Sequence, residues 1–141
     1  IPLGEIAPVA GTPFDFRECK PISAVFEEDC VQIQNAAGLD HSFAIRSDAP
    51  IQAEAYSTES GIRLTCKTTQ PAIHVYTANF VETPADLGKD GCAYGKQSAF
   101  CLETQNFPDA INHPNFPSPI LRANTPYRQE TQFHFSQKGE A

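Results

Sequence analysis

The sequence predicts an all-β protein, built as an antiparallel β-sandwich. About seven short runs alternate apolar and polar residues with a period of two, and Gly, Pro and Asn separate them. No segment shows a convincing helical period of 3.6 residues. The 141 residues are 40% apolar, which is enough for one core. We therefore expect residues 1–141 to form one domain, or part of one, with very little helix.

The amino-terminal third contains three predicted elements after an extended connection. Residues 1–12 hold two Pro and two Gly, which favours a connection over a nucleating element. Residues 12–17 carry aromatic side chains at alternate positions, which is typical of a half-buried or edge strand. Residues 31–34 alternate and end in a turn, which predicts a second strand, and residues 39–45 predict a third.

The middle of the chain predicts a hairpin, one further strand and a long loop. Residues 51–56 and 61–67 both alternate and are joined by a short polar segment, as in an antiparallel hairpin. Residues 72–77 repeat the pattern. Residues 81–95 contain Pro and Gly and form a loop of the length that is often mobile or functional.

The strand predicted at residues 100–105 sets one carboxylate beside a rigid turn. Alternation puts Glu103 on the face opposite Phe100. Three prolines within residues 108–117 exclude both a helix and a central strand there. An irregular, fixed loop is therefore expected beside the strand that carries Glu103.

The last predicted strand spans residues 130–135. Its alternation places Phe133 and Phe135 on the inward face and His134 on the outward face. The polar residues 136–141 are expected to fray.

The charge of the chain disfavours polyanionic partners. The chain contains 10 Lys and Arg residues and 17 Asp and Glu residues, which gives a net charge of −7. We therefore expect no nucleic acid and no anionic membrane as partner. No apolar run approaches the roughly 20 residues that span a bilayer, and no signal peptide is recognisable. We expect a soluble protein that binds a neutral substrate.

The five cysteines show neither a paired C-x-x-C motif nor zinc-ligand spacing. Because their number is odd, at least one is unpaired within the chain. Cys66 and Cys101 fall in predicted strands, where a free Cys is usually a small buried apolar residue, so we expect a reducing compartment, the cytoplasm. Metal motifs and nucleotide-binding Gly motifs are absent, and we expect no metal and no cofactor.

Two residues are candidates for binding, each with a simpler alternative. Asp40 lies where a turn meets a strand, and it either caps that turn through backbone N–H groups or reaches into a cleft. His74 shares a polar strand face with Tyr76, and it either contacts a ligand or is an ordinary surface residue. A carboxylate near His74 in space would favour the ligand.

Four segments resemble, in order, the signatures of the aldose 1-epimerase (galactose mutarotase) family. They are GTPFDFR at 11–17, GLDHSF at 38–43, YTANF at 76–80 and LETQNFPDAINHP at 102–114. The resemblance implies a large β-sandwich of the galactose-mutarotase type. It also implies that the protein interconverts the α and β anomers of a free hexose, galactose or glucose.

The resemblance also implies roles for particular residues. Glu103 matches the general base that removes the proton of the anomeric hydroxyl. Asp40 matches the substrate-binding aspartate, and His74 falls where many members carry a glutamine that touches the sugar. Four other residues of the matched motifs are expected to support the site: Asp15, Arg17, Asp109 and Asn112.

The resemblance leaves the catalytic acid unassigned. In the family, the acid histidine and a second sugar-binding histidine precede the GTPFDFR motif, and no histidine of this chain matches the acid. The chain also contains no Met, even at position 1, so we expect a processed, cleaved or truncated product. We expect the carboxy-terminal portion of a mutarotase, completed by an amino-terminal companion chain. The alternatives are a non-catalytic carbohydrate-binding or regulatory module and a purely structural fragment.

Overall fold

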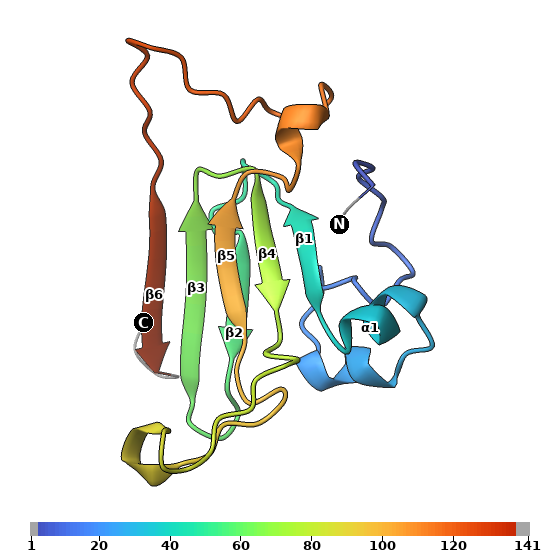
Figure 1. The fold of residues 1–141 in the computed structure, drawn as a ribbon, viewed down its shortest axis with the longest axis vertical. Helices are drawn as coiled ribbons and strands as arrows, with labels where there is room; N and C mark the ends of the chain where they lie inside the picture. Colours follow the sequence, from blue (N-terminus) through green and yellow to red (C-terminus); the bar gives the residue numbers. More distant parts are fainter. Residues whose placement is uncertain (1–2, 138–141) are drawn as a thin grey trace. The chain divides into compact units, whose positions relative to one another are not determined.

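The computed structural model describes residues 3–137 (Figure 1). Within them, six strands form two three-stranded sheets, in the orders β1-β4-β5 and β2-β3-β6. The strands are β1 (Asp40–Ala44), β2 (Ala53–Tyr56), β3 (Ile62–Thr68), β4 (Ala72–Tyr76), β5 (Cys101–Gln105) and β6 (Thr131–Gln137). The helical segments are α1 (Val31–Ala36) and the short 3₁₀ turns η1 (Ile22–Glu27), η2 (Lys89–Gly91) and η3 (Ala110–Asn112). The prediction of antiparallel sheets with little helix is confirmed.

The predicted hairpin is confirmed in β2 and β3. The two strands pair antiparallel from Ala53 opposite Cys66 to Tyr56 opposite Arg63. Gly61 closes the turn by donating its N–H to the carbonyl of Ser57 at 2.9 Å. β6 then pairs antiparallel with the whole length of β3, so the last predicted strand is confirmed. The expected fraying is wrong for Ser136 and Gln137, which pair with Arg63 and Ile62, and residues 138–141 lie outside the described residues.

The strand predicted at residues 31–34 is wrong, because these residues form the helix α1. Its carboxyl end is capped by Ala37, in the left-handed conformation at φ 55°, and by Gly38, whose N–H donates to Ile33 at 3.0 Å. Ile33 is buried while Val31 is 68% exposed, so the two do not share a face as they would in a strand. Four alternating residues cannot distinguish a strand from one turn of helix.

The strand predicted at residues 12–17 is also wrong, because this segment folds into turns. The backbone N–H of Thr12 donates to Val9, and that of Asp15 donates to Thr12. The hydroxyl of Thr12 also donates to the Val9 carbonyl at 2.7 Å. A hydroxyl that bonds its local backbone competes with strand pairing, which explains the difference.

The inward orientation predicted for Phe133 and Phe135 is wrong for the described residues. Their side chains are 48% and 65% exposed, and His134 is exposed too. Alternation shows which side chains share a face of a strand, but it does not show whether a second layer covers that face. Cys66 is buried as expected, whereas Cys101 is exposed.

The chain divides into two compact units. The first unit comprises residues 3–4, 42–73 and 104–137 and contains the whole β2-β3-β6 sheet. The second unit comprises residues 5–41 and 74–103. The most buried side chains of the second unit are Val25, Ile33, Leu39, Thr77, Ala78 and Asn79. None of the helices in residues 3–137 has the length and apolarity that crossing a bilayer requires.

Candidate active site

Asp40 and His74 form a pair across two neighbouring strands of the second unit. Nε2 of His74, on β4, lies 2.7 Å from Oδ1 of Asp40, at the start of β1. The His74 side chain is 20% exposed and the Asp40 side chain 44% exposed. A carboxylate therefore lies beside His74, which is the condition that favours a ligand-binding role over an ordinary surface histidine.

Glu103 extends this group to a third strand. It lies on β5, which neighbours β4 on the side away from β1, as Figure 1 shows. Its side chain is exposed while Leu102 and Thr104 are half-buried, as the alternation predicts. Three strands in a row thus carry Asp40, His74 and Glu103, all within the second unit. Two exposed carboxylates and an imidazole offer hydrogen-bonding groups suited to a polyhydroxylated ligand.

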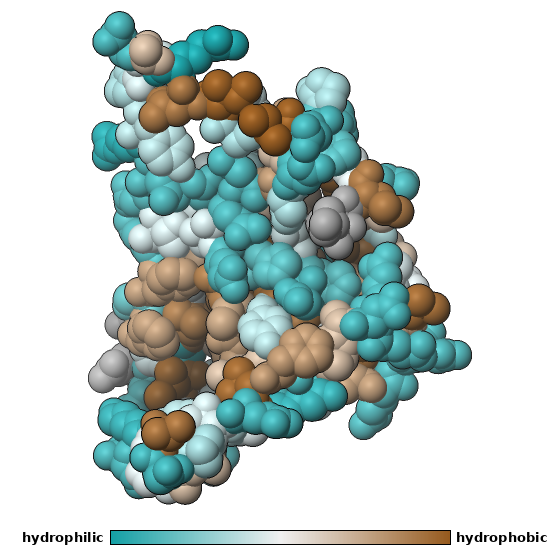
Figure 2. Space-filling view, viewed as in Figure 1, coloured by the Kyte–Doolittle hydropathy of each residue, from teal (hydrophilic) through white to brown (hydrophobic). Residues whose placement is uncertain are grey.

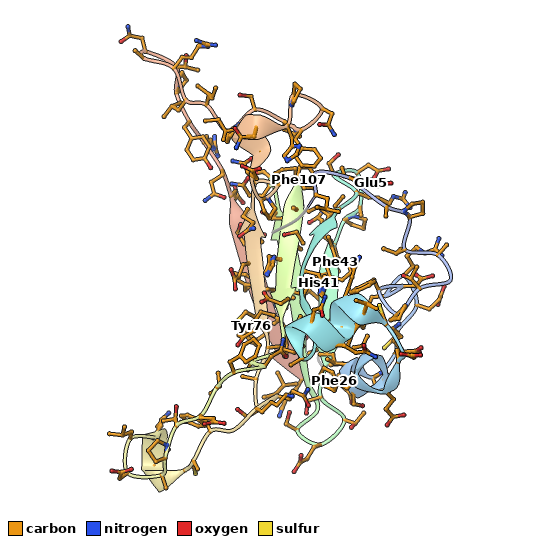
Figure 3. The ribbon with its side chains drawn as sticks, turned by 45° about the vertical axis from the view of Figure 1, so that its right-hand side comes forward. Glu5, Phe26, His41, Phe43, Tyr76 and Phe107 are labelled. Atoms are coloured by element: carbon orange, nitrogen blue, oxygen red, sulfur yellow. The ribbon has the colours of Figure 1, made fainter. Side chains whose placement is uncertain are left out.

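His41 holds the backbone of Asp40, a role that its position next to Asp40 in the sequence does not predict. The backbone N–H of Asp40 donates to Nδ1 of His41 at 3.0 Å. The His41 ring also packs against Phe14, with ring centroids 4.7 Å apart (Figure 3 labels His41). Burial lowers the pKa of His41, and His74 lowers it further while Asp40 opposes the shift. The lowered pKa favours the neutral ring, in which Nδ1 can accept the Asp40 N–H.

Thr77 and Asn79 fix the residue that precedes Asp40, and the sequence predicted no role for them. The Leu39 N–H donates to the Thr77 hydroxyl at 2.9 Å, and the Leu39 carbonyl accepts the Asn79 amide at 2.8 Å. The Thr77 hydroxyl in turn donates to Asn79 Oδ1 at 2.6 Å. Both side chains are buried. The only sequence signal was their place in the motif at residues 76–80.

Asp15 and Arg17 satisfy each other in a bidentate ion pair. Nε of Arg17 lies 2.8 Å from Oδ1 of Asp15, and Nη2 lies 2.7 Å from Oδ2. The Arg17 hydrogen bonds lower the pKa of Asp15 to about 2. Arg17 and Asp15 are hydrogen-bonded to each other, and this contact does not link them to Asp40, His74 or Glu103, so their support of the site stays a prediction.

Asp109 and Asn112 meet in the first unit, in the proline-rich loop after β5. The Asn112 amide donates to Oδ1 of Asp109, and Nε2 of His113 lies 3.4 Å from Oδ2. The ring of the buried Phe116 packs on Phe107 and on His113, at centroid distances of 4.8 and 5.2 Å. The loop is internally bonded and forms no strand, as its sequence predicts, but the exclusion of helix is too strict, because Ala110–Asn112 form the single 3₁₀ turn η3 between two prolines. The supporting role of Asp109 and Asn112 stays a prediction.

Among residues 3–137, no group of three or more His, Cys, Asp or Glu side chains could hold a metal ion. The five cysteines are free thiols, and burial raises the pKa of Cys66. The functional groups at and around the candidate site are carboxylates, imidazoles, a hydroxyl and an amide.

Fold and sequence together define the class of protein. Residues 1–134 match the aldose 1-epimerase family, and the chain belongs to that family. A solved GalM/aldose epimerase homologue from C. elegans superposes with a TM-score of 0.82 at 31% identity, over 96% of this chain and 40% of that one. The fold is thus the antiparallel β-sandwich of the galactose-mutarotase type.

Individual relatives are similar over nearly the whole chain. The galactose mutarotase of Homo sapiens is 42% identical over 138 residues, which are 96% of this chain and 39% of the relative. The aldose 1-epimerase of Escherichia coli K12 is 32% identical over 140 residues, which are 96% and 40%. The chain therefore spans about two-fifths of the length of these curated relatives.

Proposed function

We propose that this chain is part of an aldose 1-epimerase that interconverts the α and β anomers of a free hexose, galactose or glucose. The observation that carries the proposal is the set Asp40, His74 and Glu103 on three consecutive strands of one sheet. Membership of the aldose 1-epimerase family and the names of the relatives support the same reaction.

Glu103 acts as the general base in this proposal. The exposed carboxylate takes the proton of the anomeric hydroxyl while an acid protonates the ring oxygen, so the bond between C1 and the ring oxygen breaks. The open aldehyde turns about the C1–C2 bond and closes from its other face, and both protons return to where they came from. A position on a β-strand suits this role, because a general base must stay within hydrogen-bonding distance of the proton that it removes.

Asp40 and His74 bind the sugar. An ionised carboxylate accepts hydrogen bonds only, so it can take two from adjacent sugar hydroxyls. His74 lies 2.7 Å from Oδ1 of Asp40, which leaves the second oxygen for substrate. The imidazole therefore fixes the orientation of the carboxylate and borders the same bound sugar.

The catalytic acid comes from an amino-terminal portion of the same sandwich, in a companion chain or a preceding segment. Support for this comes from the curated relatives, which are about two and a half times as long as the matched region. Ile62, Phe133 and Phe135 are exposed apolar side chains on β3 and β6, and Figure 2 shows apolar surface over β6. Such a face is typical of one that another element covers.

We also propose a reducing compartment, the cytoplasm, as the location. All five cysteines are free thiols, and three of them, Cys19, Cys92 and Cys101, are exposed. Exposed free thiols persist where the thiol pool is reduced.

The experiment is polarimetry of freshly dissolved α-galactose and α-glucose with the native protein that contains this chain. Acceleration of mutarotation supports the proposal. Hexose binding without acceleration would instead indicate the non-catalytic carbohydrate-binding module. The intact mass of the native assembly, with amino-terminal sequencing of any second chain, tests where the acid comes from. A fully active monomer of residues 1–141 alone would contradict the companion portion.

A further inference from the structure

We propose that Thr77 and Asn79 are positioning residues that set the place of Asp40 at the sugar site. The inference rests on the proposed function and deepens it, since it concerns the geometry of the substrate-binding carboxylate. Neither side chain contacts the substrate in this proposal; both act through the backbone of Leu39.

The Thr77–Asn79 pair satisfies both backbone polar groups of Leu39. The Leu39 N–H donates to the Thr77 hydroxyl at 2.9 Å, while its carbonyl accepts the Thr77 N–H at 3.1 Å and the Asn79 amide at 2.8 Å. Leu39 is itself buried. Because Asp40 is the next residue, its Cα follows directly from a residue whose N–H and carbonyl are both hydrogen-bonded.

These bonds extend the pairing of β1 and β4 beyond the ends of both strands. β1 begins at Asp40 and β4 ends at Tyr76, so Leu39 and Thr77 lie one residue outside. A strand end without such bonds frays, and the first side chain of the strand then loses its position. Here, the backbone bond from the Thr77 N–H to the Leu39 carbonyl continues the pairing by one residue, and the Thr77 hydroxyl and the Asn79 amide add side-chain bonds at the end that carries the carboxylate.

Gly38 makes the close approach of Asn79 possible. Its φ of 148° lies in the range that favours glycine, and a Cβ there would lie 2.2 Å from Asn79 Oδ1 and 2.8 Å from the Thr77 hydroxyl. On its other side, the N–H of Gly38 caps α1 through Ile33. The backbone that leads into Asp40 is thus held from both directions.

The turn that carries Asn79 is anchored in its own right. Ala78 is buried with φ 51°, and its carbonyl accepts the N–H of Gln97 at 3.0 Å. The Gln97 amide also donates to the Ala37 carbonyl at 3.3 Å. A fixed support is what a positioning role requires, because a mobile partner would not define where Asp40 lies.

In this arrangement, the residue that binds the sugar, Asp40, and the residue that acts as the base, Glu103, are held independently of each other. Asp40 is held at its carboxylate by His74 and at its backbone through Leu39, whereas Glu103 lies on β5, two strands from β1. Loosening Leu39 therefore displaces the sugar-binding group and leaves the base on its strand. Loss of ground-state contacts raises KM with little change in kcat.

The test compares Thr77→Val with Thr77→Ser in the native protein that contains this chain. Valine keeps the shape of threonine but removes the hydroxyl, so the buried Leu39 N–H loses its acceptor, while serine keeps the hydroxyl. We expect Thr77→Val to raise KM for the hexose about tenfold, with kcat changed less than about threefold. Thr77→Ser should restore most of the affinity.

Val25→Ala is the control for loss of stability alone. Val25 is fully buried in the same unit, and its truncation destabilises the fold without removing a bond to Leu39. All variants are assayed well below their unfolding temperatures. A KM increase in Val25→Ala as large as that in Thr77→Val overturns the inference.

Two further outcomes separate this inference from the proposed function. If Glu103→Gln abolishes mutarotation but Thr77→Val leaves KM unchanged, the positioning role is wrong and the proposed function stands. If the native protein neither accelerates mutarotation nor binds a hexose, both are wrong.

Discussion

Nε2 of His74 lies 2.7 Å from Oδ1 of Asp40, and this contact joins β1 to β4 at the candidate sugar site. A carboxylate with one oxygen held in this way presents the other in a fixed direction. The contact orients the Asp40 carboxylate, which is the group that binds the sugar in the proposed function.

Asp40→Asn should weaken hexose binding by about ten- to a hundredfold, because hydrogen bonds to a charged acceptor are worth about 1.5–3 kcal/mol. The measurement is KM by polarimetry, supported by calorimetric titration. Asp48→Asn is the matched control, since Asp48 is an exposed loop residue paired only weakly, with Arg46 at 3.4 Å. If Asp40→Asn binds the hexose as well as the wild-type protein does, Asp40 does not bind the sugar, and the alternative role as a cap of the turn is favoured.

His74→Gln should keep most of the hexose affinity, whereas His74→Ala should lose about tenfold. Glutamine retains a donor that reaches a carboxylate, and by the family resemblance many members carry it at this position. The comparison of KM for galactose and glucose in both variants also measures whether the imidazole alters sugar preference. Equal losses in the two variants would contradict a hydrogen-bonding role.

Arg17→Gln should raise the pKa of Asp15 from about 2 toward the ordinary value of 3.8. A lowered pKa in the folded state stabilises the fold above pH 3.8, and this contribution disappears as the pH falls toward 2. The variant should therefore lose less stability over that interval than the wild-type protein does. Carbon-13 NMR titration of the Asp15 carboxyl checks the shift, and Arg46→Gln, which acts on Asp48 instead, should leave Asp15 unchanged.

His41 should make the protein less stable in mild acid. Burial lowers its pKa below 6.5, so the unfolded state binds the proton more readily and the free energy of unfolding falls as the pH drops through 6.5. His41→Asn should reduce the difference in unfolding free energy between pH 7.5 and 5.5. His134→Asn, which changes an exposed residue of β6, should preserve it. Chemical denaturation at both pH values provides the comparison.

Much of the fold was predictable because alternation is a local property. The hairpin of β2 and β3, and the strands that carry Asp40, His74 and Glu103, all follow from period-two runs closed by turn residues. Residues 31–34 alternate too, yet they form α1, because the decisive bonds come from the cap at Ala37 and Gly38 that lies beyond the run.

The site was predictable only in part. Asp40 and Glu103 came from matched motifs, while the contact between Asp40 and His74 depends on strand pairing, which a single sequence does not specify. The roles proposed for Thr77 and Asn79 depend on their hydrogen bonds to Leu39, which precedes them in the sequence by 38 and 40 positions. Local patterns hold no information about such bonds.

In the proposed function Glu103 is the base of a mutarotase, and this role is tested by the mutarotation rate of the native protein carrying Glu103→Gln. We expect kcat to fall by about a hundredfold or more while calorimetry still detects hexose binding. Glu82→Gln, which changes an exposed loop carboxylate of the same unit, should leave the rate unchanged. Mutarotation at the wild-type rate in Glu103→Gln would exclude Glu103 as the base.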